Sequence, residues 1–222
     1  LYAAAIDLAV EIAVRGTEAL ERSDRAQGPS LDAARFRFEM DFFLEHYAGS
    51  LRGVRPAPPG LRAALHALAE AAAAPGPKVL CHRDFHSRNL MVLPDGSMAM
   101  VDIQDARWGP DSYDLASLLR DAYVDIEDAL ADRMRERYRT SLPAPPPAEA
   151  FAVRYRIVAA ERMIKALGTF GYQATALGRS AYLSGVPRTL ARLRESLPSA
   201  PETRCVADAL EAEGLLEDPT AR

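Results

Sequence analysis

Several side chains that could carry out chemistry are crowded into one short stretch, CHRDFHSRN, at residues 81–89. His82, Asp84, His86 and Asn89 lie there between two apolar runs, KVLC and NLMVL. Two chemistries use such residue types. Histidines and a carboxylate at this spacing are typical of metal cages of the zinc type. An aspartate with a nearby asparagine is typical of a phosphoryl-transfer loop.

Asp102 favours the second chemistry. It follows Asn89 by thirteen residues, and an Asp95-Gly96 turn lies between them, which predicts a hairpin. The first strand would begin after Asn89 and the second would end at Asp102, so the hairpin brings these residues together. Phosphoryl transfer needs a carboxylate that orients the attacking hydroxyl and oxygen ligands for magnesium. Asp84 suits the first role, and Asn89 and Asp102 suit the second.

The metal cage is the less favoured interpretation. A zinc site needs three or four ligands. The other histidines of the chain are His46 and His66, and both lie in predicted helices at ordinary surface spacing. These positions do not complete a set of zinc ligands.

The elements that must position these residues are mostly helical. Apolar periodicity and breaks at proline and glycine predict helices over roughly residues 2–22, 31–48, 60–74, 112–125, 127–140, 148–170, 173–183, 187–196 and 202–213. Ser30 or Asp32 is expected to cap the second helix, and Asp114 is expected to cap the fourth and fix the loop before it. The predicted fold class is mainly α with a small β-hairpin (α+β).

Composition excludes several classes of protein. The 222 residues suit one large domain or two small ones, and 49% of them are hydrophobic. A net charge of −4 gives no general attraction to nucleic acid. No apolar run approaches the roughly 18 residues of a membrane span. Two cysteines are too few for a disulfide framework, so we expect a cytoplasmic protein with no membrane and no nucleic-acid partner.

The motifs carry a family resemblance. HRDFHSRN followed by VDIQDA resembles the catalytic loop and metal-binding aspartate segment of the aminoglycoside phosphotransferase-like kinases, which are relatives of the protein kinases. The longer string CHRDFHSRNLMV and MVDIQDARWGPDSYDLASLLRDAY is similar to one branch, the bacterial cell-wall amino-sugar kinases. These kinases phosphorylate N-acetylmuramate and N-acetylglucosamine at the anomeric hydroxyl, in cell-wall (peptidoglycan) recycling. RFRFEMDFFLEHY fits the same branch. The match covers roughly residues 30–125.

The resemblance implies roles for the loop and hairpin residues. Asp84 would be the catalytic base, and Asn89 and Asp102 would hold the Mg²⁺ that accompanies ATP. His86 falls where protein kinases carry a lysine near the transferred phosphate, so it is expected to help hold the γ-phosphate. The resemblance also implies that His82 packs beneath the site, as the corresponding residue does in kinase-like loops.

Four further residues are candidates for binding the acceptor, each beside a structural alternative. Asp105 would hydrogen-bond substrate hydroxyls or stabilise its loop. Trp108 would stack on a sugar ring or pack in the core. Arg88 would contact a phosphate or the lactyl carboxylate of a muramic sugar, or pair with a neighbour. Glu39 would border the acceptor pocket or lie on an exposed helix face.

One departure from the family is large. Such kinases grip ATP with a small N-terminal lobe that carries a glycine-rich loop and a lysine. Nothing before residue 80 resembles either, and no lysine precedes Lys78. The chain also opens within a helical pattern. The resemblance therefore implies that residues 1–222 are a single helical C-terminal lobe, with the catalytic loop and metal hairpin at 80–105, that binds Mg-ATP weakly by itself.

Two alternatives stay open. An aminoglycoside- or choline-type kinase takes a cationic acceptor, and Arg83, Arg88 and Arg107 argue against the acidic pocket that it needs. A non-catalytic, pseudokinase-like lobe would only bind a ligand. The sequence gives no oligomeric state.

Overall fold

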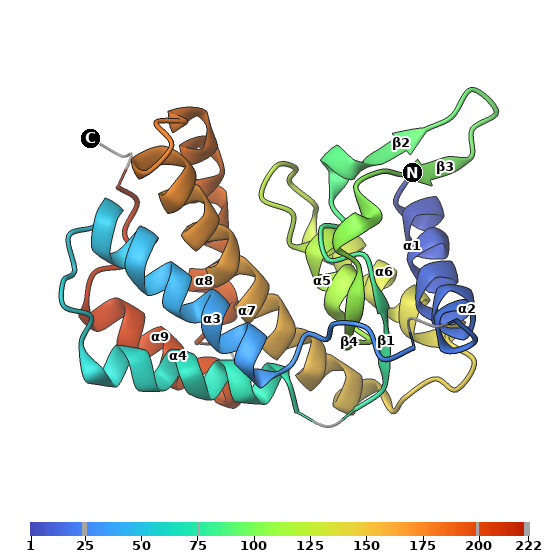
Figure 1. Cartoon of the computed structure of the whole chain (residues 1–222), viewed down its shortest axis with the longest axis horizontal. Coiled ribbons are helices and arrows are strands. Elements are labelled where there is room, and N and C mark those ends of the chain that lie inside the picture. Colours follow the sequence, from blue (N-terminus) through green and yellow to red (C-terminus); the bar gives the residue numbers. More distant parts are fainter. Residues whose placement is uncertain (24–25, 75, 199, 220–222) are drawn as a thin grey trace. The chain divides into compact units, whose positions relative to one another are not determined.

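The computed structural model describes residues 1–23, 26–74, 76–198 and 200–219. These residues form two compact units (Figure 1). Unit 1 comprises residues 1–31 and 75–155, and unit 2 comprises residues 32–74 and 156–222. Each unit is built from segments that are distant in the sequence.

Unit 1 begins with a long helical stretch, as predicted for residues 2–22. It comprises α1 (Tyr2–Glu11), a π-helical segment (Ile12–Gly16) and α2 (Thr17–Glu21). The apolar face of α1 is buried through Ala5, Ile6 and Ala9. Thr17 ties this stretch to the neighbouring strand, because its hydroxyl accepts a hydrogen bond of 2.8 Å from the backbone N–H of Leu80.

Two small antiparallel sheets follow in unit 1. The predicted hairpin is confirmed: β2 (Leu90–Val92) pairs with β3 (Met98–Met100). Gly96 at its turn has φ +83°, a conformation that glycine adopts without strain. The second sheet pairs β1 (Lys78–Cys81) with β4 (Arg107–Pro110), and β4 was not predicted.

The remaining helices of unit 1 are α5 (Tyr113–Leu119), α6 (Asp128–Ser141) and the first part of α7 (Ala148–Thr175). Every residue of α5 is buried. The helix predicted over 112–125 is right at its start but wrong at its end, because α5 stops six residues earlier, at Leu119. The prediction of separate helices at 148–170 and 173–183 is also wrong, since α7 continues to Thr175 and a 3-10 segment follows at Ser180–Gly185.

The regular elements that the structure describes in unit 2 are all helices, joined by short loops. Its elements are α3 (Ala33–Phe43), a π-helical continuation (Leu44–Leu51), α4 (Pro59–Ala72), the rest of α7, α8 (Val186–Ser196) and α9 (Pro201–Ala212). Of the two predicted caps, Ser30 and Asp32, it is Asp32 that caps α3, and it accepts from the backbone N–H of Arg35 at 2.8 Å. Two glycines let α7 lie close against α3 and its π-helical continuation. A Cβ on Gly168 would be 2.9 Å from the Cα of Phe43 in α3, and one on Gly171 would be 2.6 Å from the carbonyl oxygen of His46 in the continuation.

Within the described residues, no helix combines the length and the apolar character needed to cross a membrane.

Candidate active site

The loop of residues 82–89 connects β1 to β2 and is folded by its own hydrogen bonds. The carbonyl oxygen of Asp84 accepts from the side-chain Nδ2 of Asn89 at 2.9 Å and from the backbone N–H of His86 at 3.0 Å. A 3-10 turn at Ser87–Asn89 leads directly into β2. Asp84, the predicted base, and Asn89, a predicted magnesium ligand, are therefore joined by a hydrogen bond, although they are five residues apart in the sequence.

The first two residues of this loop, His82 and Arg83, are held by contacts with the buried interior of unit 1. His82 is fully buried, and its Nε2 lies 2.8 Å from the carbonyl oxygen of Val101, which confirms its predicted packing role. Arg83 has φ +79°, an unusual backbone conformation for a non-glycine residue. Asp114 stabilises this path, because its carboxylate accepts from the backbone N–H groups of His82 at 2.6 Å and Arg83 at 3.0 Å.

Asp114 therefore acts differently from the prediction. It was expected to cap its helix and fix the loop before it. The N-terminal cap position is Ser112, and Asp114 lies within the first turn of α5, where its carboxylate holds the 82–89 loop.

The hairpin places Asp102 beside Asn89. Leu90 is opposite Met100 in the pairing of β2 with β3, and the backbone N–H of Val101 donates to the carbonyl oxygen of Asn89 at 3.0 Å. Asp102 follows at once in the left-handed conformation, with φ +71°. It is exposed, and its Oδ1 accepts from the side chain of Gln104 at 2.5 Å.

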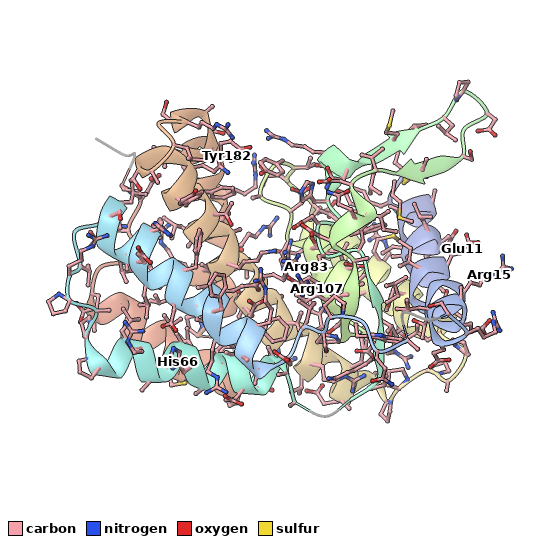
Figure 2. All side chains as sticks on the ribbon, in the orientation of Figure 1. Glu11, Arg15, His66, Arg83, Arg107 and Tyr182 are labelled. Carbon is pink, nitrogen blue, oxygen red and sulfur yellow. The ribbon has the colours of Figure 1, made fainter. Side chains whose placement is uncertain are left out.

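The residues predicted to bind the acceptor in unit 1 have structural contacts of their own. Trp108 lies in β4, and its indole N–H donates to the carbonyl oxygen of Ala26 at 3.0 Å. Asp105 is exposed and lies 3.9 Å from the guanidinium of the buried Arg83. Figure 2 shows Arg83 and Arg107 in the same part of this unit, and Arg107 is opposite Cys81 in the β1–β4 pair.

His86 and Arg88 both contact one aromatic ring that was not predicted to matter. The guanidinium carbon of Arg88 lies 3.6 Å from the ring centroid of Tyr123, and the His86 ring meets the same ring edge-on at 5.4 Å. Asp121, two residues earlier, accepts from the backbone N–H of Ser87 at 2.8 Å. The only sequence signal for this pair was its place in the family-like string LLRDAY.

Glu39 belongs to unit 2 and is buried, with 3% of its surface exposed. The alternative that it lies on an exposed helix face is therefore wrong. Its Oε1 accepts from the Nε of Arg35 at 3.0 Å, one turn earlier on α3. Its second neighbour is the carboxyl group of Glu161 of α7, which is fully buried. Burial raises the pKa of Glu161 well above 4.5, and the charge of Glu39 raises it further, against smaller opposite effects of Lys165 and Arg162.

This carboxyl pair makes stability depend on pH. We expect Glu161→Gln to stabilise the chain at neutral and alkaline pH. Below the unfolded pKa, about 4.3, Glu161 is protonated in both states and its contribution to stability is fully present. As the pH rises, the unfolded chain ionises first, so stability is lost until the pH passes the raised folded pKa. Glutamine keeps the shape and cannot ionise.

Thermal unfolding from pH 4 to pH 9 measures this effect. The Tm of the Gln variant should exceed that of the wild type by a margin that grows with pH, about 2–4 °C for each kcal/mol in a chain of this size. Glu211→Gln, at an exposed position of α9, is the matched control and should give a constant difference. Parallel curves for Glu161→Gln and the wild type would contradict the prediction.

The described residues hold no group of three or more histidine, cysteine, aspartate or glutamate side chains that could bind a metal ion. The metal cage considered for His82, Asp84 and His86 is therefore not formed. His82 is fully buried, with its Nε2 near the carbonyl oxygen of Val101.

The loop joins Asp84 to Asn89, and the hairpin places Asp102 near Asn89, which is the arrangement that the resemblance predicts for a phosphotransferase. The model of the phosphotransferase enzyme family matches residues 1–151, and the chain belongs to this family.

Similarity to individual proteins points to one kind of kinase. Three similar proteins are each named N-acetylmuramate/N-acetylglucosamine kinase. The chain is 32% identical to the Pseudomonas putida protein over 181 residues, covering 78% of this chain and 53% of that protein. It is 40% identical to the Neisseria meningitidis serogroup B protein over 123 residues (53% and 36%) and 32% identical to the Pseudomonas aeruginosa protein over 131 residues (57% and 38%). The chain thus spans about half the length of the first of these relatives, and less of the others.

Proposed function

We propose that the protein containing this chain is an ATP-dependent kinase of small molecules that phosphorylates the anomeric hydroxyl of N-acetylmuramate or N-acetylglucosamine. The observation that carries the proposal is the geometry of residues 84–102. The Asn89 side chain holds the backbone of Asp84, and the hairpin sets Asp102 next to Asn89. The names of the relatives support the choice of acceptor.

The side chains of Asn89 and Asp102 suit a magnesium ion. The Nδ2 of Asn89 is used by the carbonyl oxygen of Asp84, which leaves the amide oxygen as the group that can ligate a cation. Asp102 is exposed and supplies a carboxylate, and magnesium prefers such oxygen ligands. When bound with ATP, Mg²⁺ neutralises charge on the phosphates.

Asp84 is assigned the role of the base. It is half-buried, and its backbone is fixed by Asn89 and His86. A carboxylate held in this way can orient the acceptor hydroxyl and take its proton as the hydroxyl attacks. His86 is assigned to the transferred phosphate, since it lies two residues further on and its ring is held by Tyr123.

Asp105, Arg88, Trp108 and Glu39 remain our candidates for acceptor binding. Asp105 and Arg88 are exposed, so their polar groups can reach a sugar hydroxyl or a carboxylate. The indole N–H of Trp108 is used within unit 1, so its contribution would be the face of its ring. Glu39 would act through its ion pair with the partly exposed Arg35.

We further propose that the chain is the lobe that carries the catalytic loop, and that residues outside it clamp the nucleotide. The chain has no glycine-rich loop followed by a lysine before residue 78, and its length relative to its relatives supports the same view. Such a kinase would work in the cytoplasm, where ATP is available, in the reuse of cell-wall sugars.

A panel of acceptors tests the proposed function. The full-length gene product is assayed with Mg-ATP against N-acetylmuramate, N-acetylglucosamine, an aminoglycoside and choline, with ADP release and product phosphate both followed. We expect kcat/KM for the two amino sugars to exceed that for the cationic acceptors by about 10²-fold or more. A higher kcat/KM for choline or an aminoglycoside would show that the proposed amino-sugar acceptor is wrong. Ligand binding without ADP release would favour a non-catalytic lobe.

A further inference from the structure

A turn that follows α5 holds the middle of the 82–89 loop. Asp121 is buried, and its two carboxylate oxygens accept from two backbone N–H groups. Oδ1 accepts from Tyr123 at 2.8 Å and closes the turn. Oδ2 accepts from Ser87 at 2.8 Å and so reaches into the loop. Hydrogen bonds to a carboxylate are stronger than those between neutral groups, which makes this a firm attachment.

The ring of Tyr123 extends the attachment to both neighbours of Ser87. The guanidinium carbon of Arg88 lies 3.6 Å from the ring centroid, within the range of a cation–π contact. The ring of His86 meets the Tyr123 ring at 5.4 Å and 71°, an edge-on arrangement. The turn therefore touches three consecutive loop residues, one through its backbone and two through their side chains.

This turn is the second of two anchors that flank Asp84. Asp114, in the first turn of α5, accepts from the backbone of His82 and Arg83. Asp121 lies seven residues later in the chain, just beyond the end of α5 at Leu119. The loop is thus held on both sides of Asp84. The residues that the second anchor contacts, 86–88, directly precede Asn89.

We propose that Asp121 and Tyr123 are positioning residues for phosphoryl transfer. Asp121 fixes Ser87 and with it the path of the chain from Asp84 to Asn89, and Tyr123 fixes the side chains of His86 and Arg88. For its chemistry the proposal rests on the proposed function. Neither residue reacts. A displacement of about 1 Å at the reacting groups can cost on the order of 10²-fold in rate, so releasing this anchor lowers kcat.

A double-mutant cycle between Asp121 and Ser87 tests the anchor. Asp121→Asn keeps the shape, but its amide can accept from only one of the two N–H groups, because its nitrogen is a donor. Ser87→Pro removes the other partner. Ser87 is the first residue of the 3-10 turn and His86 before it is extended, at φ −130° and ψ 169°, which is the conformation that proline tolerates.

In the full-length protein, each single variant should lower kcat about tenfold, with KM for ATP and for the amino sugar changed less than about threefold. The double variant should resemble either single variant rather than show the roughly hundredfold loss of independent sites. Asp132→Asn, at an exposed ion pair on α6, is the control and should leave kcat unchanged. An additive cycle would show that Asp121 serves only its own turn, and the inference would fail.

The ring is tested separately. Tyr123→Phe keeps the face and edge that Arg88 and His86 contact and should retain kcat within about twofold, whereas Tyr123→Ala should lose about tenfold. Equal losses in the two variants would assign the effect to the hydroxyl and overturn the role of the ring.

Amide hydrogen exchange separates this inference from the proposed function. In Asp121→Asn, exchange in peptides that cover residues 84–92 should accelerate at least about tenfold, with the Tm within about 3 °C of the wild type. Unchanged exchange would overturn the anchor even if the enzyme is a kinase. Faster exchange in a protein that phosphorylates no amino sugar would retain the anchor and reject the proposed function.

Discussion

Replacing Asp84 with asparagine should lower kcat for the amino-sugar acceptor by about 10²- to 10⁴-fold, the usual contribution of a general base. The change should leave the loop intact. Both hydrogen bonds that fold the loop at this position, from Asn89 and His86, use the carbonyl oxygen of Asp84 and not its carboxylate. Asparagine is nearly isosteric, so KM for Mg-ATP should change little while the chemical step slows.

Steady-state kinetics of the full-length protein with saturating Mg-ATP measure this loss, and thermal unfolding checks that the fold is kept. Asp95→Asn is a matched control, because Asp95 lies at the exposed tip of the same hairpin. Its carboxylate accepts from the side chain of Ser97, which holds its pKa below the usual range. The control should retain kcat within about twofold. A similarly small effect of Asp84→Asn would remove Asp84 from the role of the base.

The loop and hairpin could be predicted because their information is local. Asn89 and Asp102 are thirteen residues apart, and the turn at Asp95 and Gly96 fixes the register between them. The predicted cap at Asp32 is local for the same reason, since a capping side chain bonds a backbone group only three residues away.

The strand β4 was missed because its partner is distant. It contains Gly109 and Pro110, both poor strand formers, and it pairs with β1 about 30 residues earlier. Gly109 is required there, since a Cβ would lie 2.9 Å from the sulfur of Cys81 and 2.8 Å from a methyl group of Leu31. A pattern that reads as a loop is thus a strand because of a tertiary contact.

The turn of Asp121 and Tyr123, which forms the second anchor, was not predicted for a related reason. The apolar spacing predicts a helix to residue 125, but Asp121 accepts from the backbone N–H of Tyr123 and replaces the helical bond of that group. Aspartate side chains compete with the helix in this way. The same competition that ends α5 early places Asp121 and Tyr123 against the 82–89 loop.

The burial of Glu39 could not be predicted from the sequence. Its helical spacing gives no sign that Glu161, more than 120 residues later, packs beside it in the core of unit 2. Two carboxyl groups in one buried place are unfavourable when both are ionised, so neither helix alone predicts the pair.

Replacing Asp102 with asparagine should have the second largest effect. We expect kcat at physiological Mg²⁺ to fall by on the order of 10²-fold, with the Mg²⁺ concentration for half-maximal rate raised, because an anionic oxygen ligand is exchanged for a neutral one. Asp102 has φ +71°, and asparagine tolerates this left-handed conformation as well as aspartate does. The amide oxygen can also still accept from Gln104.

A titration of activity with Mg²⁺ at fixed ATP measures the effect, and Asp102→Ala separates its two possible origins. Alanine removes the ligand and is also strained at positive φ, by about 1–2 kcal/mol, so it should lower both activity and Tm. Asparagine should lower activity alone. If Asp102→Asn kept the wild-type rate and Mg²⁺ requirement while Asp102→Ala lost stability, Asp102 would serve the backbone turn after β3 and the magnesium ligand would have to be sought elsewhere.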